Sequence, residues 1–299
     1  MTTIMRVLIT GKNGQVGAEI GRLYQPSNNV ILTGRDECDL SSEQSIRDAV
    51  RRFEPEIVIN SGAYTAVDLA EKERHLCFAV NAVAPGVLAQ ETARTGALLI
   101  HYSTDYVFNG KKAQPYVESD PIDPINTYGA SKAAGEKAIV EAGGRYLVLR
   151  TSWVYAAQGK NFLRTMLRLG AERPELRVVD DQVGAPTSAA AIAAATRRIA
   201  DRYQQNREYA APGIYHMTAA DSTSWCGFAR AIFDAAAIEK KPRVQPIPSS
   251  EYPTPASRPA NSVLSNDKFA RVFGFRMSGW KQQLEEVLAT MTALNEVKG

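Results

Sequence analysis

Cysteine is scarce in this sequence. The 299 residues include only Cys38, Cys77 and Cys226, which are far apart and match no metal-binding Cys/His spacing. Such a set argues against a secreted disulfide framework and against a structural zinc site. It fits a reducing compartment, so we expect a cytoplasmic protein in which the three thiols are small, buried or half-buried side chains.

Long apolar runs and an excess of one charge are also missing. No stretch reaches the roughly 18–20 apolar residues that span a membrane, and residues 1–10 lack the features of a signal peptide. The 35 basic and 32 acidic residues leave a net charge of +3. This excess is too small to predict binding to nucleic acid or to a membrane, but it is compatible with a small anionic ligand.

Short apolar runs alternate with helical patterns through the first half of the chain. The runs are rich in β-branched residues and cover residues 5–10, 30–33, 57–60, 98–102 and 146–150. Helical patterns lie between them, at residues 41–53, 71–95 and 128–142. Ser41 and Gln44 have the spacing of a capping box, and Pro85 is expected to interrupt the second helix. The alternation predicts an α/β fold with a doubly wound, Rossmann-like parallel sheet.

The composition of the sequence changes near residue 150, where prolines and short expected loops become frequent. Helical patterns continue at residues 188–204, 224–237 and 279–294. We therefore expect residues 1–150 to form a dinucleotide-binding domain. Residues 151–299 are expected to build mainly a smaller substrate-binding lobe, with some elements returning to the sheet.

A glycine-rich segment follows the first predicted strand and opens the first helix. Gly11 would permit a tight turn, Gly14 would let the backbone approach a pyrophosphate, and Gly17 would let helix and strand pack closely. The amides at the helix start, with Asn13, Gln15 and Val16, would face the phosphates. The alternative is a strand-to-helix turn with no ligand, but the position after the first strand favours a dinucleotide.

Residues at the end of the second strand should contact the adenosine ribose of that dinucleotide. Arg35 stands there and favours a 2′-phosphate, so NADPH is the expected cofactor, with NADH as a second one that could be accepted. Asp36 or Asp39 could instead meet a ribose hydroxyl. The alternative for Arg35 is a solvated arginine with no ligand.

Tyr128 and Lys132 are four residues apart in a helical pattern and therefore share one helix face. A lysine ammonium near a phenol lowers the pKa of the phenol and stabilises its phenolate, so the pair could give a proton to a carbonyl oxygen. Ser103 and Thr104 end the fourth strand, where ligands of parallel sheets bind. The alternative is a polar strand end that caps the following turn.

The glycine segment, Ser103-Thr104-Asp105 and the Tyr128–Lys132 pair together resemble the extended short-chain dehydrogenases/reductases. Longer segments resemble the dTDP-4-dehydrorhamnose reductase family over nearly the whole chain, at residues 101–108, 150–155, 161–162, 181–187 and 258–264. The resemblance implies NAD(P)H-dependent reduction of the C4 keto group of dTDP-4-dehydro-β-L-rhamnose, the last step of dTDP-rhamnose biosynthesis.

The resemblance also implies roles for individual residues. Tyr128 would be the proton donor, Lys132 would bind the nicotinamide ribose, and Thr104 would polarise the C4 carbonyl in place of the usual serine. Further cofactor contacts would come from Asp39, Leu40, Ala63, Tyr64, Thr65 and Tyr102. The substrate sugar would be contacted by Thr104, Asp105, Tyr128 and Trp153.

Two of the expected substrate contacts also follow from side-chain chemistry. The indole of Trp153 could pack on the apolar face and methyl group of a 6-deoxy sugar, or it could be a core tryptophan. The planar fork of Arg258 could clamp a pyrophosphate, or it could fix a loop through an ion pair. His101 lies in a strand and is expected to be a hydrogen-bonded core residue.

Some points depart from the family or stay open. Relatives are described as holding Mg²⁺ between subunits with acidic residues; Glu19 is one candidate, but Ala190 and Thr292 occupy the other positions, so no metal is expected. The partner would be a nucleotide sugar, and a homodimer is left open. Alternatives are another nucleotide-sugar 4-keto reductase, an epimerase, or a non-catalytic regulatory subunit on this fold.

Overall fold

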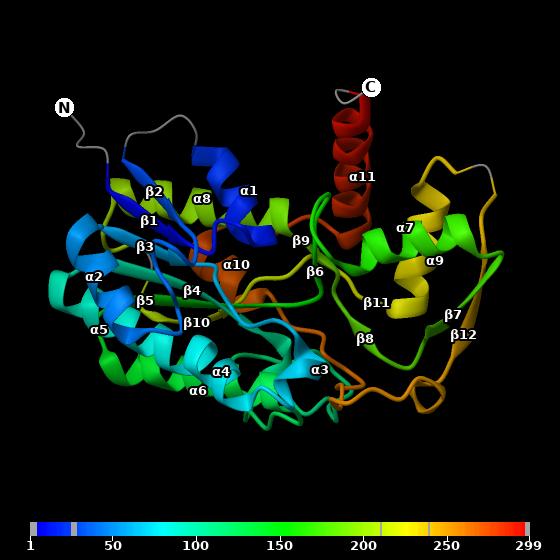
Figure 1. The fold of residues 1–299 in the computed structure, drawn as a ribbon, viewed down its shortest axis with the longest axis horizontal. Coiled ribbons are helices and arrows are strands. Elements are labelled where there is room, and N and C mark those ends of the chain that lie inside the picture. The colour runs from blue at the N-terminus through cyan, green and yellow to red at the C-terminus, as the bar shows by residue number, and fades with distance from the viewer. Residues whose placement is uncertain (1–4, 25–28, 210, 239, 297–299) are drawn as a thin grey trace.

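A six-stranded, all-parallel sheet forms the centre of the protein in the computed structural model, which describes residues 5–24, 29–209, 211–238 and 240–296 (Figure 1). Its strand order is β2-β1-β3-β4-β5-β10. The strands are β1 (Val7–Thr10), β2 (Val30–Thr33), β3 (Ile57–Asn60), β4 (Leu98–Thr104), β5 (Arg145–Thr151) and β10 (Gly213–His216). The first five confirm the predicted runs, and the sixth comes from the second half of the chain.

Helices cover both faces of the sheet, because alternate residues of each buried strand point to opposite sides. On one face Ile9, Ile59 and Ile100 pack in a common core with α1 (Gln15–Tyr24), α8 (Ala189–Gln205) and α10 (Asp267–Phe273). On the other face Leu8 and Leu99 pack with α2 (Glu43–Phe53), α5 (Ala84–Thr95) and α6 (Thr127–Ala142). The near-continuous apolar runs in the sequence reflect this two-sided burial.

The start of α2 differs by one residue from the sequence prediction. The N-cap is Ser42, whose hydroxyl accepts a hydrogen bond from the Ser45 amide, so the prediction of Ser41 and Gln44 as a capping box is wrong. Ser41 instead donates its backbone amide and hydroxyl to Asp39. Both serines can cap a helix, and the Asp39 turn decides between them.

The segment between β3 and β4 is a broken helix. It contains α3 (Val67–Ala70), α4 (Arg74–Phe78), the π-helical turn η1 (Ala79–Val83) and α5, with Pro85 in the first turn of α5 as predicted. The π turn brings Asn81 against α6. A Cβ at Gly135 of α6 would lie 2.1 Å from the Asn81 carbonyl oxygen, so only glycine permits this approach.

A smaller lobe lies on the right of Figure 1, beside the carboxyl ends of the strands. Its core includes side chains of α7 (Phe162–Glu172), α9 (Trp225–Ala235) and α11 (Trp280–Glu296). Its short strands pair as β6 (Val154–Tyr155) with β9 (Thr187–Ser188), β7 (Glu175–Val179) with β12 (Arg243–Ile247), and β8 (Val183–Gly184) with β11 (Thr223–Ser224). Two short 3-10 turns are η2 (Asp105–Val107) and η3 (Ser249–Glu251). No helix within the described ranges is long and apolar enough to cross a membrane.

Candidate functional site

The larger of two clefts, about 790 Å³ in volume, opens at the carboxyl ends of β1, β3, β4 and β5. The connections after β1 and β3 leave to opposite sides of the sheet, so this edge contains the topological switch point of the fold. Ligands of doubly wound sheets bind at such points. The cleft volume lies within the range of about 300–1,000 Å³ that is usual for small-molecule sites.

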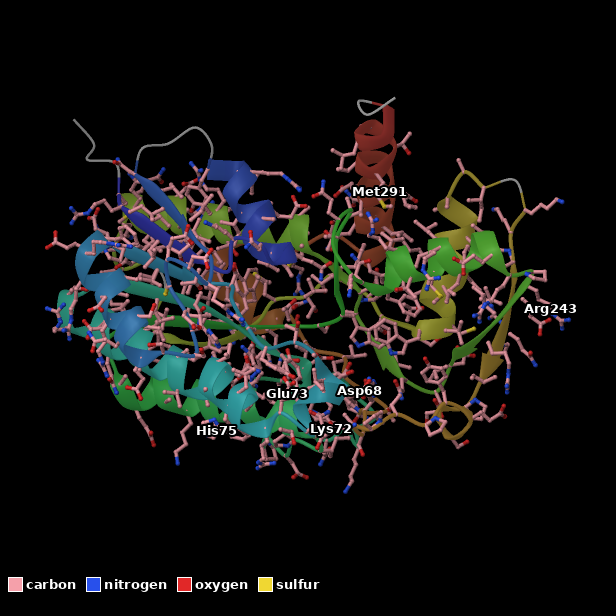
Figure 2. The ribbon with its side chains drawn as sticks, viewed as in Figure 1. Asp68, Lys72, Glu73, His75, Arg243 and Met291 are labelled. Carbon is pink, nitrogen blue, oxygen red and sulfur yellow. The ribbon has the colours of Figure 1, made fainter. Side chains whose placement is uncertain are left out.

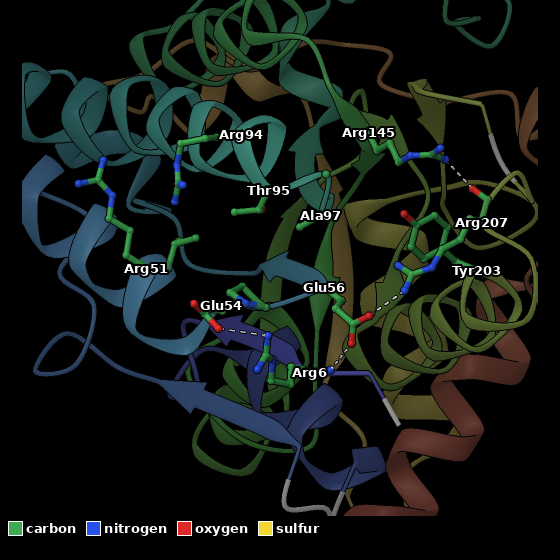
Figure 3. A pocket seen from close by; sticks show the side chains of 13 residues that line it. Arg6, Arg51, Glu54, Glu56, Arg94, Thr95, Ala97, Arg145, Tyr203 and Arg207 are labelled. Atoms are coloured by element: carbon green, nitrogen blue, oxygen red, sulfur yellow. Dashed lines mark hydrogen bonds and ion pairs between the residues drawn. The ribbon is translucent and has the colours of Figure 1, made fainter. Parts of the chain in front are cut away.

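The second cleft, about 510 Å³, lies at the amino ends of the strands (Figure 3). It is lined by several arginines, and each has a carboxylate partner. Arg6 pairs with Glu54, and Arg207 pairs with Glu56. The remaining pairs are Arg51 and Arg94 with Glu91, and Arg145 with Glu208. Because their charge is already neutralised within the protein, the candidate functional site is the larger cleft.

The glycine segment forms one wall of the larger cleft. Gly11 has a φ of +75°, and a Cβ there would lie 2.6 Å from the Gly62 amide nitrogen. A Cβ at Gly17 would lie 2.2 Å from the Gly11 carbonyl oxygen. Both positions therefore require glycine, the first for its backbone conformation and the second for the close packing of α1 on β1. The amides at the start of α1 lack intrahelical partners and suit an anion.

Most of the residues predicted to bind a cofactor line this cleft. They are Gly11, Asn13, Gly14, Gln15, Val16, Arg35, Asp39, Leu40, Ala63, Thr65, Tyr102, Tyr128 and Lys132. Gly17 lies behind the loop, where packing explains it. Tyr64 does not line the cleft; its hydroxyl donates to Glu73 on the surface, and its backbone bonds Asn81.

The tip of β2 carries charges of both signs. Arg35 is exposed at the cleft edge, and its charge helps to lower the pKa of Asp39, although hydrogen bonds from Ser41 lower it more. Glu37 accepts hydrogen bonds from the Gly34 amide and from Lys12. Among the described residues no carboxylate pairs with Arg35 and competes with a ligand phosphate, whereas Lys12 is already paired with Glu37.

Tyr128 and Lys132 are brought together on the first two turns of α6. Burial raises the pKa of Tyr128, and the Thr104 side chain opposes this rise in part. That Lys132 stabilises the Tyr128 phenolate stays a prediction. The Lys132 ammonium group donates to the Tyr102 carbonyl oxygen over 2.6 Å and lies 3.2 Å from Nε2 of His101. Burial lowers the pKa of Lys132 to about 8.

Thr104 and Asp105 form the floor of the cleft, where β4 ends and η2 begins. The Thr104 hydroxyl donates to Oδ1 of Asp105 over 3.0 Å and accepts from the Tyr106 amide. Asp105 is 2% exposed, and its Oδ2 has no hydrogen-bond partner among the described residues. Burial raises the pKa of this carboxyl to about 6. The Ser262 and Thr104 side chains oppose this rise in part. Because Asp105 lines the cleft, its carboxyl is suited to accept a hydrogen bond from a ligand.

Two stacked indoles form the wall on the side of the smaller lobe. Trp153 and Trp225 lie with ring centroids 3.5 Å apart and planes 2° from parallel, and both line the cleft. Trp153 has a φ of +47°, which is unusual for a residue with a side chain and places the indole against Gly184. Trp153 is thus a cleft residue rather than a core tryptophan.

Arg258 does not line the cleft. Its guanidinium forms a two-point ion pair with Asp68 of α3, with N–O distances of 3.1 and 2.9 Å, and also donates to Thr254 and the Ala256 carbonyl. Figure 2 labels Asp68. This geometry is that of the loop-fixing ion pair, and the pyrophosphate clamp stays a prediction. Because Val67, next to Asp68, does line the cleft, this pair ties the cleft rim to the C-terminal loop.

The acidic residue considered for a metal is engaged elsewhere. Glu19 forms an ion pair with Arg22, one turn further along α1. Across the ranges that the structure describes, no three His, Cys, Asp or Glu side chains gather in a metal-binding arrangement. The three cysteines are free and buried.

Several cleft residues escaped the sequence analysis. Trp225, Val67 and Lys160 line the cleft but belong to none of the motifs. Tyr106 also lines it and lies within the segment 101–108, but no role was assigned to it. The others arrive from loops and helix starts of the second half, or from α3, and spacing along the chain does not reveal them.

Comparison with known proteins agrees with this geometry. Residues 5–293 match the family model described as RmlD substrate binding domain. The chain is 49% identical over 285 residues to a dTDP-4-dehydrorhamnose reductase of Burkholderia thailandensis, covering 93% of this chain and 96% of the relative. It is 41% identical to the dTDP-4-dehydrorhamnose reductase of Escherichia coli K12, with 96% and 99% covered.

A solved structure gives the same result. The crystal structure of a dTDP-4-dehydrorhamnose reductase from Bacillus anthracis in complex with NADP has a TM-score of 0.88 and 36% sequence identity to this chain, covering 96% of it and 99% of the relative. The match extends over both lobes and so includes every wall of the cleft. The chain therefore belongs to the dTDP-4-dehydrorhamnose reductase family of extended short-chain dehydrogenases/reductases.

Proposed function

We propose that this protein reduces the C4 keto group of dTDP-4-dehydro-β-L-rhamnose with NAD(P)H and releases dTDP-L-rhamnose. The observation that carries the proposal is the meeting of Tyr128, Lys132 and Thr104 with a glycine-lined loop in one cleft. The names of the relatives at 41–49% identity support the substrate. The activity completes the synthesis of the activated sugar.

The residues of the cleft fit a dinucleotide. The glycine loop lines the cleft, and the amides at the start of α1 suit a pyrophosphate. Arg35, exposed at the edge of the cleft, would meet a 2′-phosphate, which supports NADPH over NADH. When bound, the reduced nicotinamide supplies the hydride that goes to C4.

The protein supplies the proton and the orientation of the substrate. A buried phenol with a raised pKa keeps its proton at neutral pH, so Tyr128 is a donor to the C4 oxygen as this oxygen gains charge. The keto group becomes a hydroxyl, and the phenolate left behind is stabilised by the Lys132 ammonium and the Thr104 hydroxyl. Trp153 packs on the apolar face of the sugar, and Asp105 accepts a hydrogen bond from a sugar hydroxyl.

Turnover of NADPH with a panel of dTDP- and other nucleotide 4-keto sugars tests this function. We expect stoichiometric NADPH oxidation with dTDP-4-dehydro-β-L-rhamnose and a loss of about 10²–10⁴-fold in Tyr128→Phe. Tyr146→Phe is the matched control, since Tyr146 is half-buried on β5 and does not line the cleft. Near-normal turnover of Tyr128→Phe would refute the assignment.

The same experiment separates the alternatives. An epimerase would retain NAD after purification and consume no NADPH, and a regulatory subunit would show saturable binding to another enzyme without turnover. We expect the protein in the cytoplasm, where its three free thiols stay reduced. The homodimer stays a prediction that light scattering tests.

A further inference from the structure

A row of buried polar side chains crosses the sheet beneath the cleft. Thr10 of β1 is paired with Asn60 of β3, and Asn60 is paired with His101 of β4, so the three lie in register on adjacent strands. All are at most 1% exposed. None lines the cleft itself, and the reaction described above leaves them without a role.

Hydrogen bonds join this row to the active-site lysine. The Thr10 hydroxyl is 2.7 Å from the side-chain oxygen of Asn60, and the side-chain nitrogen of Asn60 is 2.9 Å from Nδ1 of His101. Nε2 of His101 is in turn 3.2 Å from Nζ of Lys132. The chain therefore runs without interruption from β1 to the ammonium group.

The direction of these hydrogen bonds depends on the charge of Lys132. A lysine ammonium only donates, so His101 must accept at Nε2 and carry its own proton at Nδ1. That proton needs the amide oxygen of Asn60, and the amide nitrogen then donates to Thr10. If Lys132 is a neutral amine, every bond can reverse: Thr10 donates to Asn60, Asn60 to Nδ1, and Nε2 to the amine. The structure has the Asn60 amide in the second orientation, with its oxygen toward Thr10 and its nitrogen toward Nδ1, and a turn of the amide gives the first.

We propose that Thr10, Asn60 and His101 form a reversible hydrogen-bond chain that holds Lys132 as an ammonium ion during the reaction. His101 is a positioning residue, because it acts on Lys132 and touches neither cofactor nor substrate. It stays uncharged throughout, since burial and the neighbouring lysine both lower its pKa. The chain thus adapts by moving a proton between the two ring nitrogens, not by charging the ring.

The other charged and titratable neighbours of Lys132 do not replace this chain. Glu136 of α6 favours the ammonium, but it is committed to Arg150 through bonds of 2.9 and 2.7 Å. Cys77 of α4 also favours it, but its thiol pKa is raised by burial, so it is neutral. Tyr128 of α6 is a neutral phenol until it gives up its proton. The Tyr102 carbonyl and His101 therefore supply the direct bonds to the ammonium.

The tautomer of His101 can be observed in the wild-type protein without any substrate. We expect nitrogen NMR of protein labelled with ¹⁵N-histidine to show Nδ1 protonated and Nε2 unprotonated near pH 6.5. The two assignments should exchange as the pH rises through about 8, where Lys132 loses its proton. The sequence has three histidines, so His101→Gln identifies the signals of His101. A single tautomer at all pH values from 6 to 9.5 would overturn the proposal.

Turnover provides a second test, which rests on the proposed reductase activity. In His101→Leu the ammonium loses an acceptor, and the alkaline limb of the kcat profile should move down by about one pH unit. At pH 8.5 this is roughly a tenfold loss of kcat, with the KM for the nucleotide sugar unchanged. His101→Gln should restore the limb, because an amide oxygen can accept in place of Nε2.

The two tests separate failure of this inference from failure of the proposed function. If no nucleotide sugar is reduced, the proposed function fails. The inference about His101 is then still tested by NMR of the wild-type protein, which needs no substrate. Equal alkaline limbs in wild type and a folded His101→Leu would overturn the inference while leaving the reductase activity intact. Melting curves show whether His101→Leu is folded. If it is not folded, the NMR spectrum of the wild-type protein alone tests the inference.

Discussion

Replacing Asp105 with asparagine should stabilise the protein at pH 8 while weakening the binding of the sugar. The pKa of this buried carboxyl is raised from 3.8 to about 6. It therefore binds more protons in the folded chain than in the unfolded one, and the folded state loses stability as the pH rises from about 4 through 6. At pH 8 the whole shift of about two pKa units acts, which corresponds to about 3 kcal/mol. At pH 5 only about half of this cost is present.

Urea unfolding of wild type and Asp105→Asn, followed by tryptophan fluorescence between pH 5 and 8, measures this difference. The asparagine keeps an acceptor for Thr104 but cannot ionise, so its stability advantage should grow by about 1.4 kcal/mol from pH 5 to pH 8. Asp120→Asn is the control, since Lys112 holds the pKa of Asp120 below its usual value of 3.8. This carboxyl is ionised in the folded and the unfolded chain from pH 5 to 8, so the stability difference of its variant should hardly vary over this range. A stability difference for Asp105→Asn that does not vary with pH would show that burial does not raise the pKa of this carboxyl.

Three further variants test other parts of the structure. Glu136→Gln leaves the buried Arg150 without its counter-ion and should cost about 3–5 kcal/mol of unfolding free energy in urea titrations; an unchanged midpoint would show that the pair is unimportant. Gly17→Ala places a methyl group 2.2 Å from the Gly11 carbonyl, so the NADPH dissociation constant from fluorescence quenching should rise at least about tenfold, and unchanged affinity would contradict the packing argument. Arg35→Ala should lower kcat/KM for NADPH roughly tenfold relative to NADH, and an unchanged ratio would remove Arg35 from cofactor selection.

The sheet could be predicted from the sequence because its strands are buried on both faces. Runs such as residues 57–59 are apolar throughout, and the structure turns each of the predicted runs into a strand of the parallel sheet. The cap of α2 was missed by one residue, since Ser41 and Ser42 have equal capping ability and the turn at Asp39 chooses between them. Local chemistry thus identifies an element more reliably than its ends.

The site was partly predictable for a related reason. Residues at strand ends and in the glycine loop share a cleft because the topology brings strand ends together. Contacts between segments far apart in the chain carry no local signal: Arg258 meets Asp68, and Trp153 stacks on Trp225. The bond from Lys132 to the Tyr102 carbonyl depends on the depth at which α6 packs, which helical spacing does not determine.

The position of β10 late in the chain has a consequence for folding during synthesis on the ribosome. This strand pairs with β5 but is made more than 60 residues later, and α8, which packs on α1, also follows the smaller lobe's first elements. A nascent chain that ends before residue 213 therefore exposes the open edge of β5, and one that ends before residue 189 also lacks the cover of α8 on one face of the sheet. We expect the sheet to stay incomplete until the second half of the chain has been made. Chaperones should therefore bind nascent chains up to this length and release them once β10 has paired with β5.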